Sequence, residues 1–151
     1  MTNTRHSSAF PLQLLIVALF TTLFILSGAT HARAGGPSIE VTVDIDPVLK
    51  SKSIPAQTVF IFAKAVQGPR APLAAVRLKV SDLPATVTLD DSKAMAPMFR
   101  LSKFNEVLVS ARVSQSGRPI KGSGDFEGVT PTIKLGQTKQ VVSVTINKVV
   151  P

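Results

Sequence analysis

The chain has 151 residues, of which 44% are hydrophobic, and its 17 Lys and Arg against 9 Asp and Glu give a net charge of +8. This length supports one small domain, and the apolar fraction excludes an intrinsically disordered chain. There is no Cys, Trp or Tyr, and both histidines, His6 and His31, fall within the first 34 residues.

Residues 1–34 have the three-part pattern of a secretory signal peptide. A polar start with Arg5 precedes an apolar stretch over residues 10–26, and Ala32-Arg33-Ala34 fits an A-x-A cleavage site. We expect cleavage after Ala34 and a periplasmic location. An uncleaved anchor that holds the domain at the inner membrane is the alternative, because the uncharged stretch 7–30 is long enough to span a bilayer.

The expected mature domain, residues 35–151, carries 15 basic and 9 acidic residues and contains no imidazole and no thiol. Ser-His-Asp and Cys-His mechanisms, ordinary zinc sites, covalent haem attachment and thiol–disulfide exchange all need one of these groups. We therefore expect a protein that is not an enzyme and holds no cofactor or metal. The basic residues are scattered and lack stacking Tyr or Trp, so nucleic acid is not an expected partner.

The mature chain alternates apolar and polar residues in short runs that Pro and Gly interrupt, the pattern of half-buried strands. Residues 58–63 are apolar on both faces, which indicates a central strand. In the run 106–114, Val109 is expected to face the core and Arg112 the solvent, so Val109→Asp should unfold the domain and Arg112→Asp should be nearly silent. Six or seven strands and no helix predict an all-β, antiparallel, Ig-like β-sandwich that is a monomer. The expected strands are residues 39–45, 58–63, 76–81, 86–90, 106–114 and 142–147.

The segment 90–104 contains both methionines of the mature domain, three residues apart and beside an acid pair. Three interpretations stay open: the apolar side chains fill one end of the sandwich, they form a partner-contact loop, or the two thioethers bind Cu(I). As a contact loop, its candidate residues are Asp90, Asp91, Met95, Met98, Phe99 and Arg100.

A second acidic segment, Gly124-Asp125-Phe126-Glu127-Gly128, contains two carboxylates in a glycine turn. Calcium loops use such residues, but two acids in this setting are more typical of a polar connection.

Several motifs resemble, in the same order, the C-terminal periplasmic domain of the CcmI (CycH) family of c-type cytochrome maturation proteins. The longest is PLAAVRLKVSDLP at residues 72–84, and the similarity covers nearly all of residues 39–151. The other matching segments are residues 46–47, 59–63, 87–92, 94–95, 100–102, 111–117 and 124–128.

The resemblance implies an Ig-like sandwich without catalytic activity that assists in presenting apocytochrome c to the haem-ligation machinery. Family members carry a two-span membrane module and a helical-repeat (TPR) domain before the sandwich, whereas here one export signal precedes it. We therefore expect a periplasmic accessory module whose partners are apocytochrome c or other maturation components. A stand-alone structural or interaction β-domain of the cell envelope and Met-based Cu(I) handling are the alternatives.

Overall fold

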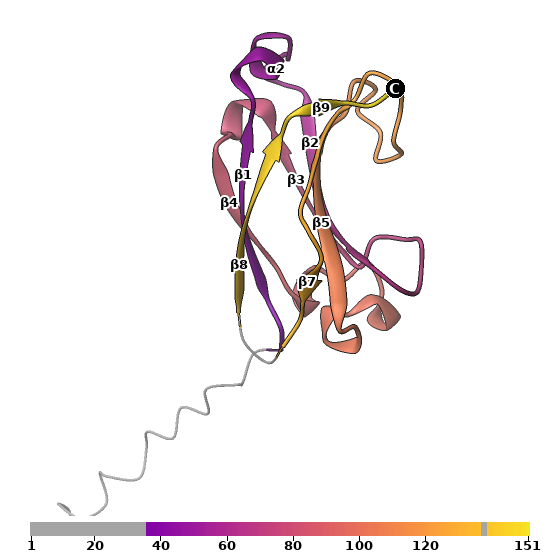
Figure 1. Ribbon diagram of the computed structural model, residues 1–151. Coiled ribbons are helices and arrows are strands. Elements are labelled where there is room, and N and C mark those ends of the chain that lie inside the picture. Colours follow the sequence, from indigo (N-terminus) through magenta and orange to yellow (C-terminus); the bar gives the residue numbers. More distant parts are fainter. Residues whose placement is uncertain (1–35, 137–138) are drawn as a thin grey trace, which may run out of the picture. The chain divides into compact units, whose positions relative to one another are not determined.

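The computed structural model describes residues 36–136 and 139–151, which belong to one compact unit, Ala34–Pro151 (Figure 1). The expected signal peptide, residues 1–34, lies outside the described residues. Two β-sheets pack face to face, and the apolar side chains on their inner faces form the core. The predicted all-β sandwich is confirmed.

The smaller sheet has three strands in the order β4 (Ala85–Leu89), β1 (Ile39–Ile45) and β8 (Gln140–Ile146). Alternate residues of β1, beginning with Ile39, are buried against the opposite sheet, as the sequence pattern predicts. The pair β1–β4 is antiparallel, but β1–β8 is parallel, which departs from the expected all-antiparallel arrangement. The two strands come from opposite ends of the domain, so the intervening strands provide the long crossover that a parallel pair requires.

The larger sheet has the order β3 (Ala74–Lys79), β2 (Thr58–Ala65), β5 (Glu106–Val113), β6 (Phe126–Val129) and β9 (Lys148–Val149), and β7 (Ile133–Lys134) also pairs with β5. The central place predicted for residues 58–63 is confirmed, since β2 pairs with β3 on one side and β5 on the other. Three strands lie outside the expected ranges: β7 and β9 have two residues each, too short to leave a periodic signal, and β6 begins within the segment 124–128, whose glycines and acids predicted a polar connection instead.

Short helical segments contradict the expectation of no helix. The helix α2 (Pro47–Ser51) is capped by Asp46, whose carboxylate accepts a hydrogen bond from the Val48 backbone nitrogen. Proline is favoured at the first helical position, which Pro47 occupies. Single 3-10 turns follow at η1 (Val80–Asp82), η2 (Asp91–Lys93), η3 (Pro97–Phe99) and η4 (Leu101–Lys103). The strand expected over residues 76–81 therefore ends at Lys79. In the part of the chain that the structure describes, no helix is both long enough and apolar enough to cross a membrane.

The two sheets approach each other closely where β6 passes β8. A side chain at Gly128 would overlap the backbone carbonyl of Thr145, so this approach requires glycine. Just beyond, the Asn147 backbone nitrogen donates to the Glu127 carbonyl at 3.3 Å, and the chain passes from β8 in the smaller sheet to β9 in the larger one. This edge of the sandwich is closed by the continuity of the chain itself.

The outer face of β5 is not the solvated face that its polar residues predict. Val109 faces the core with no exposed surface, as expected, but Arg112 is only 2% exposed, and Ser110 and Ser114 are also buried. The connection between β5 and β6 provides hydrogen-bond partners for this face, since Arg118 and Pro119 offer their carbonyl oxygens to Ser114 and Arg112. The expectation that Arg112 lies in solvent and tolerates a charge reversal is wrong, because strand alternation predicts the face of a residue but not whether a loop covers that face.

Candidate functional site on the outer face of the larger sheet

The acid pair of the expected contact loop holds that loop in shape. The Asp90 carboxylate accepts a hydrogen bond from the Ser92 backbone nitrogen at 2.8 Å and so caps η2. The Asp91 carboxylate accepts from the backbone nitrogen and hydroxyl of Ser102, at 3.0 and 2.6 Å. Both side chains therefore have structural partners within the segment where they lie.

The apolar residues of this loop divide into two groups. Leu101 is fully buried, and Phe99 and Phe104 pack partly buried against the core. Met95 and Met98 are 61% and 64% exposed, so the interpretation that they fill the end of the sandwich is wrong. Arg100 is exposed as well.

The methionines lie in a segment that is attached to the edge of the larger sheet. The Met95 backbone nitrogen donates to the Leu73 carbonyl at 2.9 Å, and Ala94 forms a bridge with Ala74, the first residue of β3. In the described ranges, no three His, Cys, Asp or Glu side chains are grouped to hold a metal ion.

A second candidate site is built on the outer face of β2. Phe60 and Phe62 alternate with core-facing residues and so project from the same side of the sheet. The strand register places Phe60 between Arg77 on β3 and Arg112 on β5. This row of side chains from three neighbouring strands forms the floor of a groove.

Cationic groups lie over both aromatic rings of this floor. The Arg77 guanidinium carbon is 5.1 Å from the centre of the Phe60 ring, and the Lys64 Nζ is 5.1 Å from the centre of the Phe62 ring. The Arg112 guanidinium carbon is 5.6 Å from the Phe62 ring centre. These separations are within the range of cation–π attraction, which positions the charged side chains over the floor.

The connection from β5 to β6 forms one wall of the groove and is fastened by a buried ion pair. The Arg112 Nε lies 3.4 Å from the Asp125 Oδ2, and both side chains are at most 3% exposed. Asp125 also accepts hydrogen bonds from the backbone nitrogens of Gln115 and Gly122, at 2.9 and 3.0 Å. Asp125 is thus the residue that holds this connection over the sheet, a role that its glycine-rich setting did not reveal.

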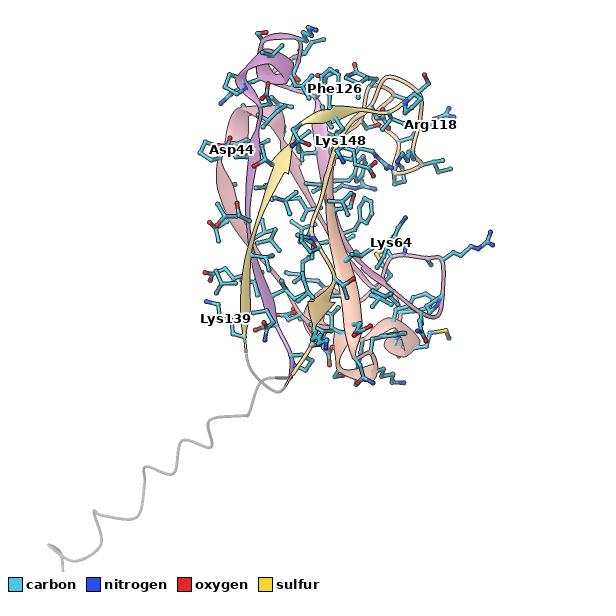
Figure 2. The ribbon with its side chains drawn as sticks, viewed as in Figure 1. Asp44, Lys64, Arg118, Phe126, Lys139 and Lys148 are labelled. Atoms are coloured by element: carbon cyan, nitrogen blue, oxygen red, sulfur yellow. The ribbon has the colours of Figure 1, made fainter. Side chains whose placement is uncertain are left out.

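The resulting groove has a volume of about 480 Å³. Met95 from the expected contact loop lines one part of it, and Pro119, Ile120 and Lys121 from the β5–β6 connection line another. Ile120 is 77% exposed, so the lining offers free apolar surface from both loops. Figure 2 shows Lys64 on the side of the larger sheet that faces away from β1 and β8.

The groove carries positive charge that the surrounding carboxylates do not fully balance. Arg112 pairs with Asp125, and Lys121 pairs with Glu127. Lys64 and Arg77 form no ion pair with any carboxylate of the described residues. The site therefore combines exposed aliphatic surface with two cations available to an anionic group, above two Phe rings that are only 4% and 6% exposed.

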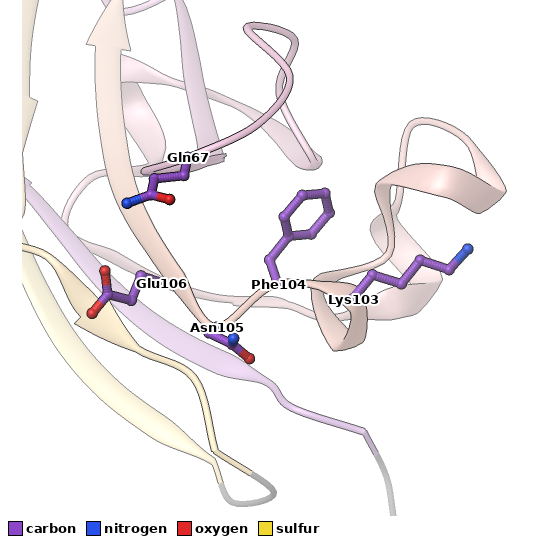
Figure 3. Close-up of a pocket in the computed structure, with 5 residues that line it drawn as sticks. All are labelled: Gln67, Lys103, Phe104, Asn105 and Glu106. Carbon is purple, nitrogen blue, oxygen red and sulfur yellow. The ribbon is translucent and has the colours of Figure 1, made fainter.

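A second hollow of about 410 Å³ lies where β5 begins, lined by Gln67, Lys103, Phe104, Asn105 and Glu106 (Figure 3). The Lys103 side chain extends away from the other labelled residues, and the lining is mainly polar. The Glu106 carbonyl accepts a hydrogen bond from the Val66 backbone nitrogen, and the Asn105 carbonyl accepts one from the Leu135 backbone nitrogen. This region therefore joins neighbouring segments of the fold. Its lining contains one cation, Lys103, together with a carboxylate, Glu106, whereas the groove over β2 contains Lys64 and Arg77 without a paired carboxylate among the described residues.

The predicted contact loop contributes one residue to a wall of the groove, whereas the floor lies on strands outside that loop. Of the six predicted contact residues, only Met95 lines the groove, and none of the others does. A usable signal was present, because two Phe residues two positions apart on a central strand must place their rings on one face. What the sequence did not reveal is which basic residues the neighbouring strands align with those rings.

Comparison with known proteins links this geometry to a family. A profile described as "Cytochrome c-type biogenesis protein H Ig-like domain" matches residues 39–147, which include every strand from β1 to β8. The chain belongs to this family. The resemblance to CycH proteins and the Ig-like fold expected from it are both confirmed.

Among curated proteins, a "Cytochrome c-type biogenesis protein CycH" of Pseudomonas aeruginosa is 47% identical to the chain over 89 residues. The aligned region is 59% of this chain and 22% of that relative, so the match spans about a fifth of the longer protein's length. No solved structure matches the chain.

Proposed function

We propose that this CycH Ig-like domain is a non-catalytic, periplasmic binding module of c-type cytochrome maturation that assists the presentation of apocytochrome c to the haem-ligation machinery. The observation that carries the proposal is the family match across residues 39–147. The similar protein of Pseudomonas aeruginosa is itself named as a cytochrome c-type biogenesis protein. The match covers 22% of that relative, so the proposal concerns the contribution of this one domain.

The fold is suited to binding by a preformed surface. Two packed sheets hold the groove floor, and the buried Arg112–Asp125 pair holds one wall, so a partner would meet a site that is already ordered. A preformed site reduces the ordering cost that association must overcome. Met95 and Ile120 supply exposed apolar contact, and Lys64 and Arg77 supply charge, which are the means of holding a polypeptide rather than of transforming it.

Deletion of the gene, followed by staining of periplasmic and membrane cytochromes for covalently bound haem, tests the proposal. We expect the deletion strain to lose covalent haem staining and the full-length chain to restore it. A Val109→Asp chain is the matched negative control, because a charge at this fully buried position should prevent folding. Unchanged haem staining in the deletion strain would contradict the proposal and favour a structural β-domain of the envelope.

A binding measurement tests whether the partner is the haem-free form of cytochrome c. Purified protein expressed from the full-length sequence is immobilised and offered the same cytochrome c with and without its haem. We expect retention of the haem-free polypeptide and not of the folded holoprotein. Equal retention of both, or of neither, would contradict a role in apocytochrome presentation.

A further inference from the structure

The groove over β2 combines two features that point to the chemistry of its occupant. Lys64 and Arg77 extend over the rings of Phe62 and Phe60 without a carboxylate partner among the described residues. Met95 and Ile120, from two different loops, add exposed apolar surface at 61% and 77% of their areas. Charge of one sign next to apolar surface is complementary to a ligand that carries opposite charge and apolar groups close together.

We propose that this groove docks an extended, acidic polypeptide segment of a partner protein, whose aliphatic or aromatic side chains lie against the exposed surfaces of Met95 and Ile120, above the nearly covered rings of Phe60 and Phe62. The segment's carboxylates pair with the Lys64 ammonium and the Arg77 guanidinium. The proposal rests on the proposed function for its cellular setting, while the binding chemistry itself is set by these side chains.

The dimensions of the floor favour an extended chain over a helix. The floor comes from β3, β2 and β5, and neighbouring strands lie about 4.8 Å apart, so it is roughly 10 Å wide between the outer strands. A helix with its side chains has a diameter of about 10–12 Å and would already fill that width before the flanking loops are counted. An extended segment fits between the walls and can direct alternate side chains to the floor.

The cations are placed to bind without leaving the aromatic rings. Lys64 and Arg77 have apolar stems that can stay in contact with the rings while their charged ends turn to a carboxylate. An ion pair at the edge of an apolar groove is less screened by solvent than one on an open surface, and a guanidinium can bind a carboxylate through two parallel hydrogen bonds. Arg112 and Lys121 do not add to this attraction, because Asp125 and Glu127 already neutralise them.

The shape of the site favours a polypeptide over an anionic membrane. The floor lies between walls formed by Met95 and by the Pro119–Lys121 stretch, so a flat lipid surface would meet the walls before it reached Phe60 or Phe62. A single polypeptide segment is narrow enough to enter. Vesicle binding is therefore an informative outcome of the test.

The probe is a fluorescently labelled peptide of ten residues in which Asp or Glu alternates with Leu or Phe, titrated by anisotropy with protein expressed from the full-length sequence. We expect saturable binding that weakens with added salt, and no binding of a peptide in which Lys replaces every acid. The double variant Lys64→Glu/Arg77→Glu should weaken binding about tenfold or more, since each lost exposed ion pair is replaced by a repulsion. Lys52→Glu, an exposed charge reversal outside the groove, should leave binding unchanged.

A matched pair of variants tests the apolar part of the site. Ile120→Ser should weaken peptide binding several-fold, whereas Ile54→Ser, at a loop residue of similar exposure outside the groove, should not. Far-UV circular dichroism and thermal unfolding of every variant check that the sandwich remains folded.

Three outcomes would overturn the proposal: no binding of the acidic peptide, binding that Lys64→Glu/Arg77→Glu leaves unchanged, or binding of anionic vesicles alone. These are distinguishable from failure of the proposed function. If deletion abolishes haem attachment but the folded Lys64→Glu/Arg77→Glu chain restores it fully, the role in maturation stands and the groove is not its binding site.

Discussion

Two loops flank the groove, and they are held in different ways. The loop of residues 90–104 is fastened by carboxylates that bind neighbours in the same segment, as Asp90 does with Ser92 and Asp91 with Ser102. The connection of residues 114–125 is fastened across the sheet surface by the buried pair Arg112–Asp125. The carboxylates of the first loop act by exposed local capping, whereas the carboxylate of the second acts through a desolvated ion pair.

The difference decides how much each loop can tolerate. An exposed capping interaction contributes about 0.5–2 kcal/mol, because water replaces most of what is lost. Removing one member of a buried ion pair leaves an uncompensated charge in a dry environment and costs about 3–5 kcal/mol. The two sides of the same groove should therefore respond very differently to the loss of one carboxylate.

Among changes to the groups that fasten the two loops, the largest effect is expected for Arg112→Asp. The new carboxylate would lie in the buried site beside Asp125 and repel it, so the free energy of unfolding should fall by about 4 kcal/mol or more. Chemical denaturation measures the change. Arg118→Asp, an exposed reversal in the same connection, is the control and should change stability by less than about 0.5 kcal/mol. Equal stability of the two variants would show that the buried pair does not fasten this wall.

Asp125→Ala should be the next most damaging change. It leaves the Arg112 guanidinium buried without its carboxylate and removes the acceptor for the backbone nitrogens of Gln115 and Gly122, for a loss of about 3 kcal/mol. The loss of stability in the double variant Arg112→Met/Asp125→Ala should be smaller than the summed losses of the single variants Arg112→Met and Asp125→Ala, because the double variant leaves neither charge buried without its partner. Strict additivity in a double-mutant cycle would contradict the coupling.

A smaller effect is expected on the other side of the groove. Asp91→Ala removes two hydrogen bonds to Ser102 at the surface and should cost about 1 kcal/mol, measured by thermal or denaturant unfolding. Lys93→Ala, a neighbouring exposed change in the same turn, should be close to neutral. A loss as large as that of Asp125→Ala would remove the distinction between the two loops.

Ile120→Ser should have the smallest effect on folding. The side chain is 77% exposed, so its truncation should alter stability by less than about 0.5 kcal/mol while it reduces peptide binding. A marked loss of stability would indicate that Ile120 supports the fold rather than a docking surface.

The contrast also explains what the sequence could predict. Alternation in segments such as residues 39–45 and the two-sided apolar run 58–63 predicted the strands and the central place of β2, because strand periodicity is a local property. The burial of Arg112 depends on Asp125, thirteen positions away in the chain, and on a connection that folds over the strand. No local pattern encodes that pairing, so strand alternation alone predicts a solvent-exposed Arg112.

The same distinction between local pattern and long-range pairing applies to the residues of the candidate site. The exposed methionine Met95 was singled out because it is unusual in this sequence, and it does line the groove. The alignment of Arg77 and Arg112 beside Phe60 depends on strand order and register in the larger sheet, which the periodicity of single strands does not determine. The parallel β1–β8 pair was missed for the same reason.

We propose that this CycH Ig-like domain contacts its partner in cytochrome c maturation through the groove over β2. Covalent haem staining in the deletion strain, complemented in parallel by the unmodified chain, Lys64→Glu/Arg77→Glu and Lys52→Glu, tests it most directly. We expect the unmodified chain and Lys52→Glu to restore staining, while the groove variant, present at equal level, leaves it clearly reduced. Full restoration by the groove variant would show that the groove is not the binding surface, and a deletion strain that never lost staining would show that the protein has no role in haem attachment.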